Sequence, residues 1–144
     1  MLGQLEAGRR VVIADMEAGA GTLTRMPPGS LDVAVLVVEP SAKSIDVARR
    51  ASAIIAERRI GRLLVVANRV RAEGDLELIR AGLPGIETVG VPDDPAIVQA
   101  DREAHAPIDT AADGPGVQAL ATLALRLERW SRRPAPDETL PVLS

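Results

Sequence analysis

Four short runs of aliphatic residues recur along the chain, and they constrain its fold more than any other feature. They cover residues 11–16, 33–39, 63–70 and 88–91, and each is rich in valine. Runs of this length and composition predict β-strands, and a continuous apolar run is typical of a parallel strand covered on both faces. Because helical patterns separate the runs, the sequence predicts an α/β fold with a short, mostly parallel sheet flanked by helices.

Helical periodicity follows the second, third and fourth of these runs. We expect helices over residues 42–59, from 74 or 75 to 81, over 95–104 and over 116–130. Ser41 is a suitable N-cap for the first of them, and Gly61 is a suitable stop. The inward stripe of this first helix is predicted to be Ile45, Ala48, Ser52 and Ile55. The inward stripe of the last helix is predicted to be Val117, Leu120, Ala124 and Leu127.

The length of the chain, 144 residues, fits one domain of ordinary size. We expect a single α/β domain over residues 1–132 and an extended, proline-rich tail over residues 133–144. The link between the first two predicted strands, residues 17–32, contains GAGTLTRMPPGS and is predicted to be a loop with at most one helical turn.

Composition excludes several classes of site. The chain has no cysteine and one histidine, which rules out disulfides, thiolate metal sites and histidine-based metal clusters. A net charge of −3 and a single aromatic residue, Trp130, argue against direct contact with nucleic acid. No apolar run is long enough to span a membrane, so we expect a cytoplasmic protein.

Asp15 stands at the end of the first predicted strand and is followed by Glu17, Ala18 and Gly19. A lone acid at a strand end often only caps the next turn. No G-x-x-x-x-G-K-[ST] phosphate-binding loop occurs anywhere in the chain, and its only lysine is Lys43.

Four sequence motifs, taken together, resemble those of a known protein family. VVIADMEAG, VAVLVVEPS, LLVVANRV and VGVPDDPAIVQAD have the order and spacing of the C-terminal half of MinD/ParA-like P-loop ATPases of the SIMIBI class. Within that family, D-x-E-A-G and V-x-E-P-S are typical of the CooC-type accessory ATPases of carbon monoxide dehydrogenase. The resemblance covers most of residues 11–127 and implies a partial P-loop NTPase, Rossmann-like fold that lacks the P-loop strand.

The resemblance also implies roles for individual residues. Asp15 matches the acid near Mg²⁺, which it would reach through water, and Glu17, Ala18 and Gly19 match the switch loop behind the γ-phosphate. The residues that match nucleotide-binding positions are Asn68, Arg69, Pro92 and Asp94.

Local structure offers a simpler account for some of these residues. Asn68 could make local turn bonds at a strand end. Asp93 and Asp94 suit the start of a helix, whatever the function, because negative charge is favourable there.

The chain departs from the family in two respects. The P-loop, which supplies most of the phosphate affinity and charge stabilisation, is absent, so we do not expect this chain alone to hydrolyse ATP. The Cys-x-Cys pair of the nickel-inserting members is absent too, which excludes nickel handling by that route. ATP and Mg²⁺ are expected as cofactors only where a P-loop half is supplied.

The missing P-loop strand also affects the sheet. Unpaired central backbone groups are costly to bury, at roughly 1–3 kcal/mol each, so we expect re-pairing, an intermolecular strand contact or a partner. The expected partners are a second copy of the chain or a separately encoded P-loop-bearing polypeptide, together with a client protein. One hypothesis is a truncated or split ATPase that switches a dimer with Mg-ATP. The alternative is a catalytically inactive binding or regulatory module that homodimerises or docks on a partner protein.

Overall fold

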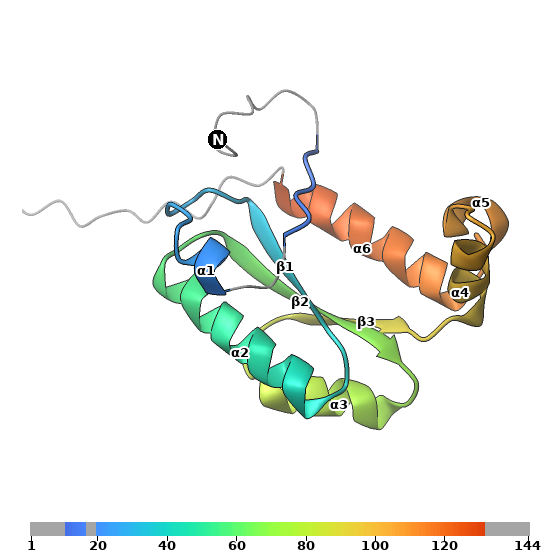
Figure 1. Cartoon of the computed structure of the whole chain (residues 1–144), viewed down its shortest axis with the longest axis horizontal. Helices are drawn as coiled ribbons and strands as arrows, with labels where there is room; N and C mark the ends of the chain where they lie inside the picture. Colours follow the sequence, from blue (N-terminus) through green and yellow to red (C-terminus); the bar gives the residue numbers. More distant parts are fainter. Residues whose placement is uncertain (1–10, 17–19, 132–144) are drawn as a thin grey trace, which may run out of the picture.

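The computed structural model describes residues 11–16 and 20–131, and within them three parallel strands form one sheet. The strands run in the order β1-β2-β3, with helices on both faces of the sheet (Figure 1). The strands are β1 (Val33–Val38), β2 (Arg62–Val70) and β3 (Thr88–Pro92). The helices are α1 (Ala20–Leu23), α2 (Ala42–Glu57), α3 (Glu73–Gly82), α4 (Pro95–Arg102), α5 (Pro107–Thr110) and α6 (Pro115–Ser131). The predicted fold class is therefore confirmed.

The central strand β2 pairs in parallel with both neighbours. Its register with β1 runs from Val33↔Arg62 to Val38↔Ala67, and its register with β3 is interrupted between Ala67 and Val70. Side chains from Leu64 to Ala67 are buried on alternating faces. This explains why the sequence of β2 is continuously apolar, since both of its faces are covered.

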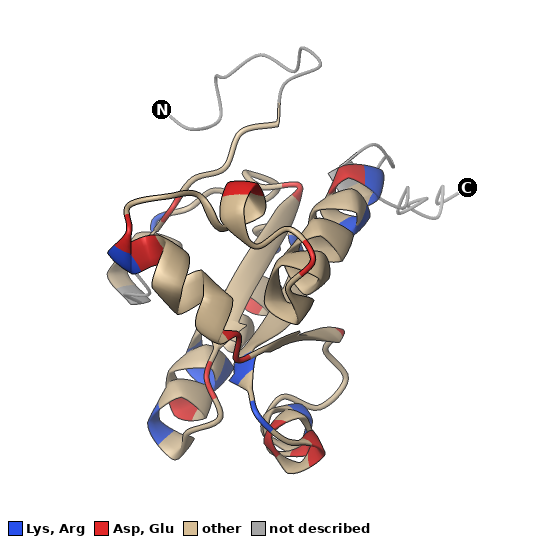
Figure 2. Cartoon of the chain, turned by 90° about the vertical axis from the view of Figure 1, so that its right-hand side faces the viewer, with Lys and Arg blue, Asp and Glu red and all other residues tan. Residues whose placement is uncertain are grey.

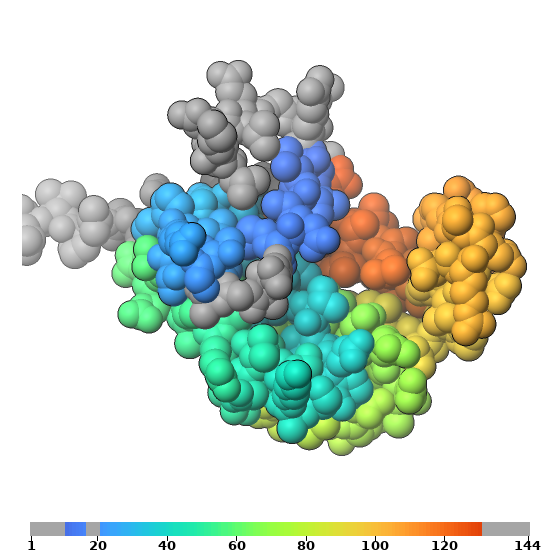
Figure 3. All heavy atoms as spheres, in the orientation of Figure 1, coloured from blue at the N-terminus to red at the C-terminus, as the bar shows by residue number. Residues whose placement is uncertain are grey.

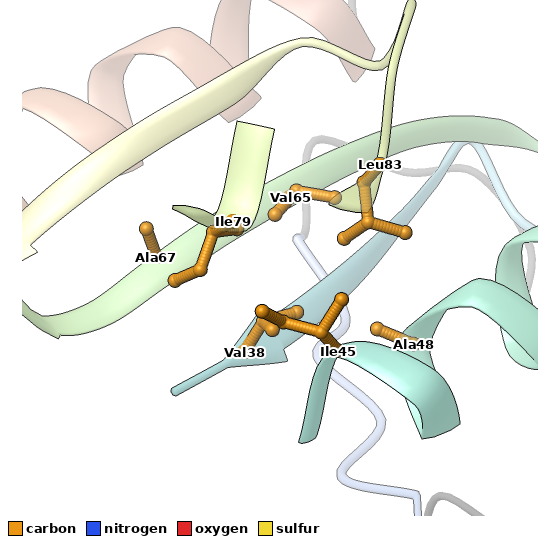
Figure 4. Close-up of a cluster of buried hydrophobic side chains, with 7 residues drawn as sticks. All are labelled: Val38, Ile45, Ala48, Val65, Ala67, Ile79 and Leu83. Carbon is orange, nitrogen blue, oxygen red and sulfur yellow. The ribbon is translucent and has the colours of Figure 1, made fainter. Parts of the chain in front are cut away.

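Helices α2 and α3 cover one face of the sheet. Ile45 and Ala48 of α2 meet Val38 of β1, and Ile79 of α3 closes the same cluster (Figure 4). The predicted stripe of α2 is confirmed, because all four of its members are buried. Ser41 is its N-cap, since the Ser41 hydroxyl accepts a hydrogen bond from the backbone N–H of Ser44 at 3.2 Å.

The end of α2 differs from the prediction. The helix ends at Glu57, and it is Arg59, with a φ of 50°, that adopts the left-handed conformation predicted for a glycine. Gly61 has a different role, because a Cβ at this position would lie 2.5 Å from the carbonyl oxygen of Leu31. Gly61 thus lets the segment before β1 lie close to the start of β2.

Helix α6 covers the other face of the sheet. Leu64, Val66 and Val91 of the strands pack against Leu123 of α6. The predicted inward stripe of α6 is correct at Val117 and half-buried Leu127 but wrong at Leu120, which is 43% exposed, and at Ala124, which is also exposed. Apolar residues occur on more than one side of this helix, so periodicity alone did not determine which side faces the sheet.

The first predicted strand is wrong. Residues 11–16 enter no strand, and Val11, Val12 and Ile13 are 70%, 58% and 88% exposed. Figure 3 shows this segment in dark blue at the surface of the molecule. Only Met16 packs against a buried cluster, the one that α1, α2 and β1 build. Although the outer edge of β1 is open, this segment does not pair with it, and it pairs with no other strand among the described residues.

The remaining predictions on element boundaries are close. The link before β1 contains one short helix, α1, as expected. Helix α5 was not predicted. The tail over residues 133–144 and the switch-loop residues Glu17, Ala18 and Gly19 lie outside the described residues. Within the described part of the chain, no helix has both the length and the apolar character that a membrane span requires.

Candidate functional site

Charged side chains gather where the three parallel strands end. Glu39 follows β1, Arg69 and Arg71 stand at and after the end of β2, and Asp93 follows β3. Figure 2 looks toward this edge of the sheet and shows acidic and basic segments meeting between the strand ends and the helices. In open α/β sheets, ligands bind outside the carboxyl ends of the strands, which makes this edge the candidate site.

Asp93 is the centre of the cluster. Its Oδ2 accepts a hydrogen bond from Nε of Arg71 at 2.8 Å, and its Oδ1 accepts one from Nε of Arg69 at 3.4 Å. A terminal guanidinium nitrogen of Arg69 also lies 3.7 Å from Oε1 of Glu39. The two arginines thus link the loops that follow all three strands.

Ionisation of Asp93 reflects these contacts. The hydrogen bond from Arg71 holds the pKa of the Asp93 carboxyl below its usual range; desolvation opposes that shift and the bond from Arg69 reinforces it. The hydrogen bond to Asp93 likewise raises the pKa of Arg71. Both arginine side chains are more than half exposed, so solvent screens the pairs and they position the loops more than they stabilise the fold.

The backbone at Arg69 has an unusual conformation. Its φ is 58°, in the left-handed region, at the point where the register between β2 and β3 is interrupted. A non-glycine residue in this region costs roughly 1–2 kcal/mol, and such residues gather at functional sites. After this break, the carbonyl of Val70 accepts a hydrogen bond from the backbone N–H of Asp93 at 3.0 Å, which restores contact with the end of β3.

Asp94 has both carboxylate oxygens engaged by the backbone. Oδ1 accepts from the N–H of Ala96, which makes Asp94 the N-cap of α4, and Oδ2 accepts from the N–H of Gly116 in α6, each at 2.9 Å. The residue is 6% exposed. A Cβ on Gly116 would lie 2.7 Å from the Cβ of Asp94, so the two helices meet closely here. Asp94 therefore joins the starts of α4 and α6.

The other nucleotide-binding candidates lie at the same edge of the sheet. Asn68 is half-buried near the end of β2, and its side chain makes no hydrogen bond within the described part of the chain. Pro92 is the last residue of β3 and is the register partner of Val70. All four residues therefore lie at or just after the carboxyl ends of β2 and β3, and their role in nucleotide binding stays a prediction.

Asp15 is not part of this cluster. It is exposed in the segment 11–16, and no hydrogen bond or ion pair among the described residues joins it to the cluster. The described residues also contain no group of three or more histidine, aspartate or glutamate side chains that could hold a metal ion. Mg²⁺ usually takes one or two carboxylates together with waters and phosphate oxygens. Asp15 fits one such ligand but does not by itself make a metal site.

Sequence reasoning missed two members of the cluster. Arg71 received no role, and Asp93 was interpreted only as charge at a helix start. The signal was the pair of arginines at the end of one predicted strand together with the pair of aspartates at the end of the next. Their contact depends on the left-handed backbone conformation at Arg69. This conformation is usually signalled by a glycine in the sequence, and none is present at this position.

The outer side of β1 is a second feature of the site region. Among the described residues no strand pairs with β1 on the side away from β2. Val35 and Val37, on the face of β1 away from α2, are 38% and 64% exposed. A valine-rich strand of a parallel sheet is thus open at its edge and on one face, where sheets of this kind are ordinarily covered.

Comparison with known proteins gives a consistent result. No protein-family model matches the chain. An uncharacterized ATP-binding protein of Methanocaldococcus jannaschii is 35% identical over 95 residues, which make up 63% of this chain and 37% of that protein. The solved structure of the MinD cell division protein of Aquifex aeolicus matches with a TM-score of 0.59 and 26% identity, over 75% of this chain and 47% of that chain. The chain therefore spans less than half the length of either protein.

The sequence comparison and the structure comparison point to related kinds of protein. The ATP-binding relative matches in sequence, MinD matches in fold, and the parallel strands carry their charged residues at the carboxyl edge. These findings support a relationship between this chain and the MinD-like P-loop ATPases.

Proposed function

We propose that this chain is one part of a split or truncated MinD/ParA-like ATPase and that it works with a P-loop-bearing polypeptide. The open side of β1 carries the proposal, because the added polypeptide would supply a strand beside β1 and cover Val35 and Val37. The same addition would give residues 11–16 a neighbour. The assembly would then switch a dimer with Mg-ATP, and the phrases D-x-E-A-G and V-x-E-P-S favour a CooC-type ancestry.

In this assembly the residues of the chain would have separate tasks. Asn68 offers a donor and an acceptor to the edge of adenine, and its amide is free of other hydrogen bonds in the described structure. Arg69 and Pro92 would lie beside the base, and Asp94 would hold the loop that carries Pro92. Asp15 would bind Mg²⁺ through water, and the P-loop would bind the phosphates when ATP is present.

The test starts from the tagged full chain in its native cells. We expect a co-purifying polypeptide that contains a P-loop motif, and binding of a fluorescent ATP analogue with Mg²⁺ by the reconstituted pair but not by this chain alone. Val37→Asp should abolish the pairing, because it places a charge on the surface to be covered. Leu125→Asp is the matched control, since Leu125 is 61% exposed on α6 and should leave pairing intact.

Two results would overturn the proposal. One is a pair that still assembles normally with Val37→Asp. The other is a reconstituted pair, with a verified P-loop, that binds no nucleotide.

The contacts of Asp94 are equally compatible with a second function. Both of its oxygens serve the junction of α4 and α6, so this residue is fully used by the fold. A catalytically inactive module that homodimerises or docks on a partner would require only this structural role of Asp94. This alternative predicts partner binding that does not change when Mg-ATP is added or removed.

A further inference from the structure

A shallow hollow lies at the opposite edge of the sheet from the charged cluster. Helices α2 and α6 both end on the side where β2 begins (Figure 1). The hollow between them has a volume of about 560 Å³. Its aliphatic lining comes mainly from Ala53, Ala56, Leu63 and Ile86.

Two charged residues of the hollow differ in their contacts. Glu87 is paired with Arg126 of α6. The guanidinium of Arg62 lies over the ring of Trp130, 4.5 Å from its centre, and makes no ion pair within the described part of the chain. The hollow therefore offers aliphatic walls, an aromatic surface and one cation without a carboxylate. It suits a short apolar peptide that carries an acidic group.

The chain itself contains such a peptide. Residues 132–144, which lie outside the described residues, read RRPAPDETLPVLS and follow Trp130 closely in sequence. Asp137 and Glu138 precede the apolar residues Leu140, Val142 and Leu143. Asp137 follows Trp130 by seven positions, a length of chain that spans up to about 23 Å, so the acidic residues can reach Arg62 beside Trp130.

We propose that residues 137–143 of this chain dock in the hollow. A carboxylate of Asp137 or Glu138 meets Arg62, and the apolar residues after it contact the aliphatic walls. A short connection gives the segment an effective concentration in the millimolar range, so a weak contact is enough to keep the hollow covered. The contact is independent of nucleotide and of the proposed ATPase assembly.

Trp130 reports on this contact directly, because it is the only tryptophan in the chain. Acrylamide quenching of its fluorescence is measured on the full chain and on the double variant Asp137→Lys, Glu138→Lys. We expect stronger quenching in the variant, with the docked-to-free ratio lowered about two- to fivefold, as for an exposed ion pair. Equal quenching in the two proteins would overturn the proposal.

A charge exchange separates direct contact from general effects. Arg62→Glu alone should raise quenching, and combining it with the two lysine substitutions should restore protection. Failure of this rescue would contradict the assigned partner. Arg102→Gln on α4 is the control and should change nothing. Protection should also be independent of protein concentration, whereas loss of protection on dilution would assign the peptide to a second copy and overturn docking within one chain.

Discussion

The junction of α4 and α6 provides the sharpest test of the structure. Asp94→Ala removes two hydrogen bonds at once, from the backbone N–H groups of Ala96 and Gly116. The first is a helix N-cap, and the second joins the starts of two helices through residues that are 22 positions apart in the sequence. Since Asp94 is 6% exposed, little solvent is available to replace the lost acceptor.

The magnitude follows from the two bonds. Loss of an N-cap carboxylate costs about 1 kcal/mol, within a range of roughly 0.5–2. Leaving the N–H of Gly116 without a partner costs a further ~1–3 kcal/mol. We therefore expect the free energy of unfolding to fall by about 2–4 kcal/mol, out of a total of roughly 5–15 kcal/mol for an ordinary domain. The variant should remain folded in buffer.

Urea unfolding, followed by Trp130 fluorescence and by circular dichroism, measures the loss. Asp94→Asn keeps one acceptor oxygen and should lose about half as much as the alanine variant. Asp101→Ala, at an exposed position of α4, is the control and should stay within about 0.5 kcal/mol of the wild type. If Asp94→Ala costs no more than this control, the carboxylate does not join the two helices and the reasoning is refuted.

Two further predictions concern backbone space and ionisation. Gly61→Ala should lower the free energy of unfolding by about 1–3 kcal/mol, because its Cβ would lie 2.5 Å from the carbonyl oxygen of Leu31. Gly74→Ala in α3, where a Cβ meets nothing within 4 Å, should instead stabilise by about 0.5–1 kcal/mol; urea unfolding distinguishes them, and equal effects would contradict the close approach. Because the folded-state pKa of Asp93 lies below its unfolded value, its contribution to stability is present above the unfolded pKa of about 3.9 and is lost as the pH falls through the folded pKa. Arg71→Gln should raise the pKa of Asp93 in a carboxyl NMR titration, and an unchanged pKa would show that the hydrogen bond is not its cause.

The sequence predicted those strands and helices whose apolar residues follow a regular pattern. Three valine-rich runs became strands, and α2 buries the stripe that its periodicity indicated. The run over residues 11–16 is also apolar, yet among the described residues it pairs with no strand, and composition does not show which runs will find a pairing partner. In α6, apolar residues occur on several sides of the helix, so the sequence did not determine which side faces the sheet.

The contacts of the charged cluster could not be predicted from the sequence. The resemblance to MinD/ParA-like ATPases assigned Asn68, Arg69, Pro92 and Asp94 to nucleotide binding, and in the structure they lie at or just after the ends of β2 and β3. The bonds of Asp93 to two arginines depend on the left-handed backbone of Arg69. Arginine rarely adopts this conformation, and no residue pattern signals it.

The open side of β1 has a consequence for the amount of protein in the cell. An uncovered valine-rich edge can pair with the same edge of another copy, and such pairing is a common start of aggregation. Chains made in excess over whatever covers β1 would therefore associate with one another or be degraded. If a partner covers β1, as proposed above, the edge would tie the usable quantity of this chain to the supply of that partner, as a matter of stoichiometry rather than of affinity.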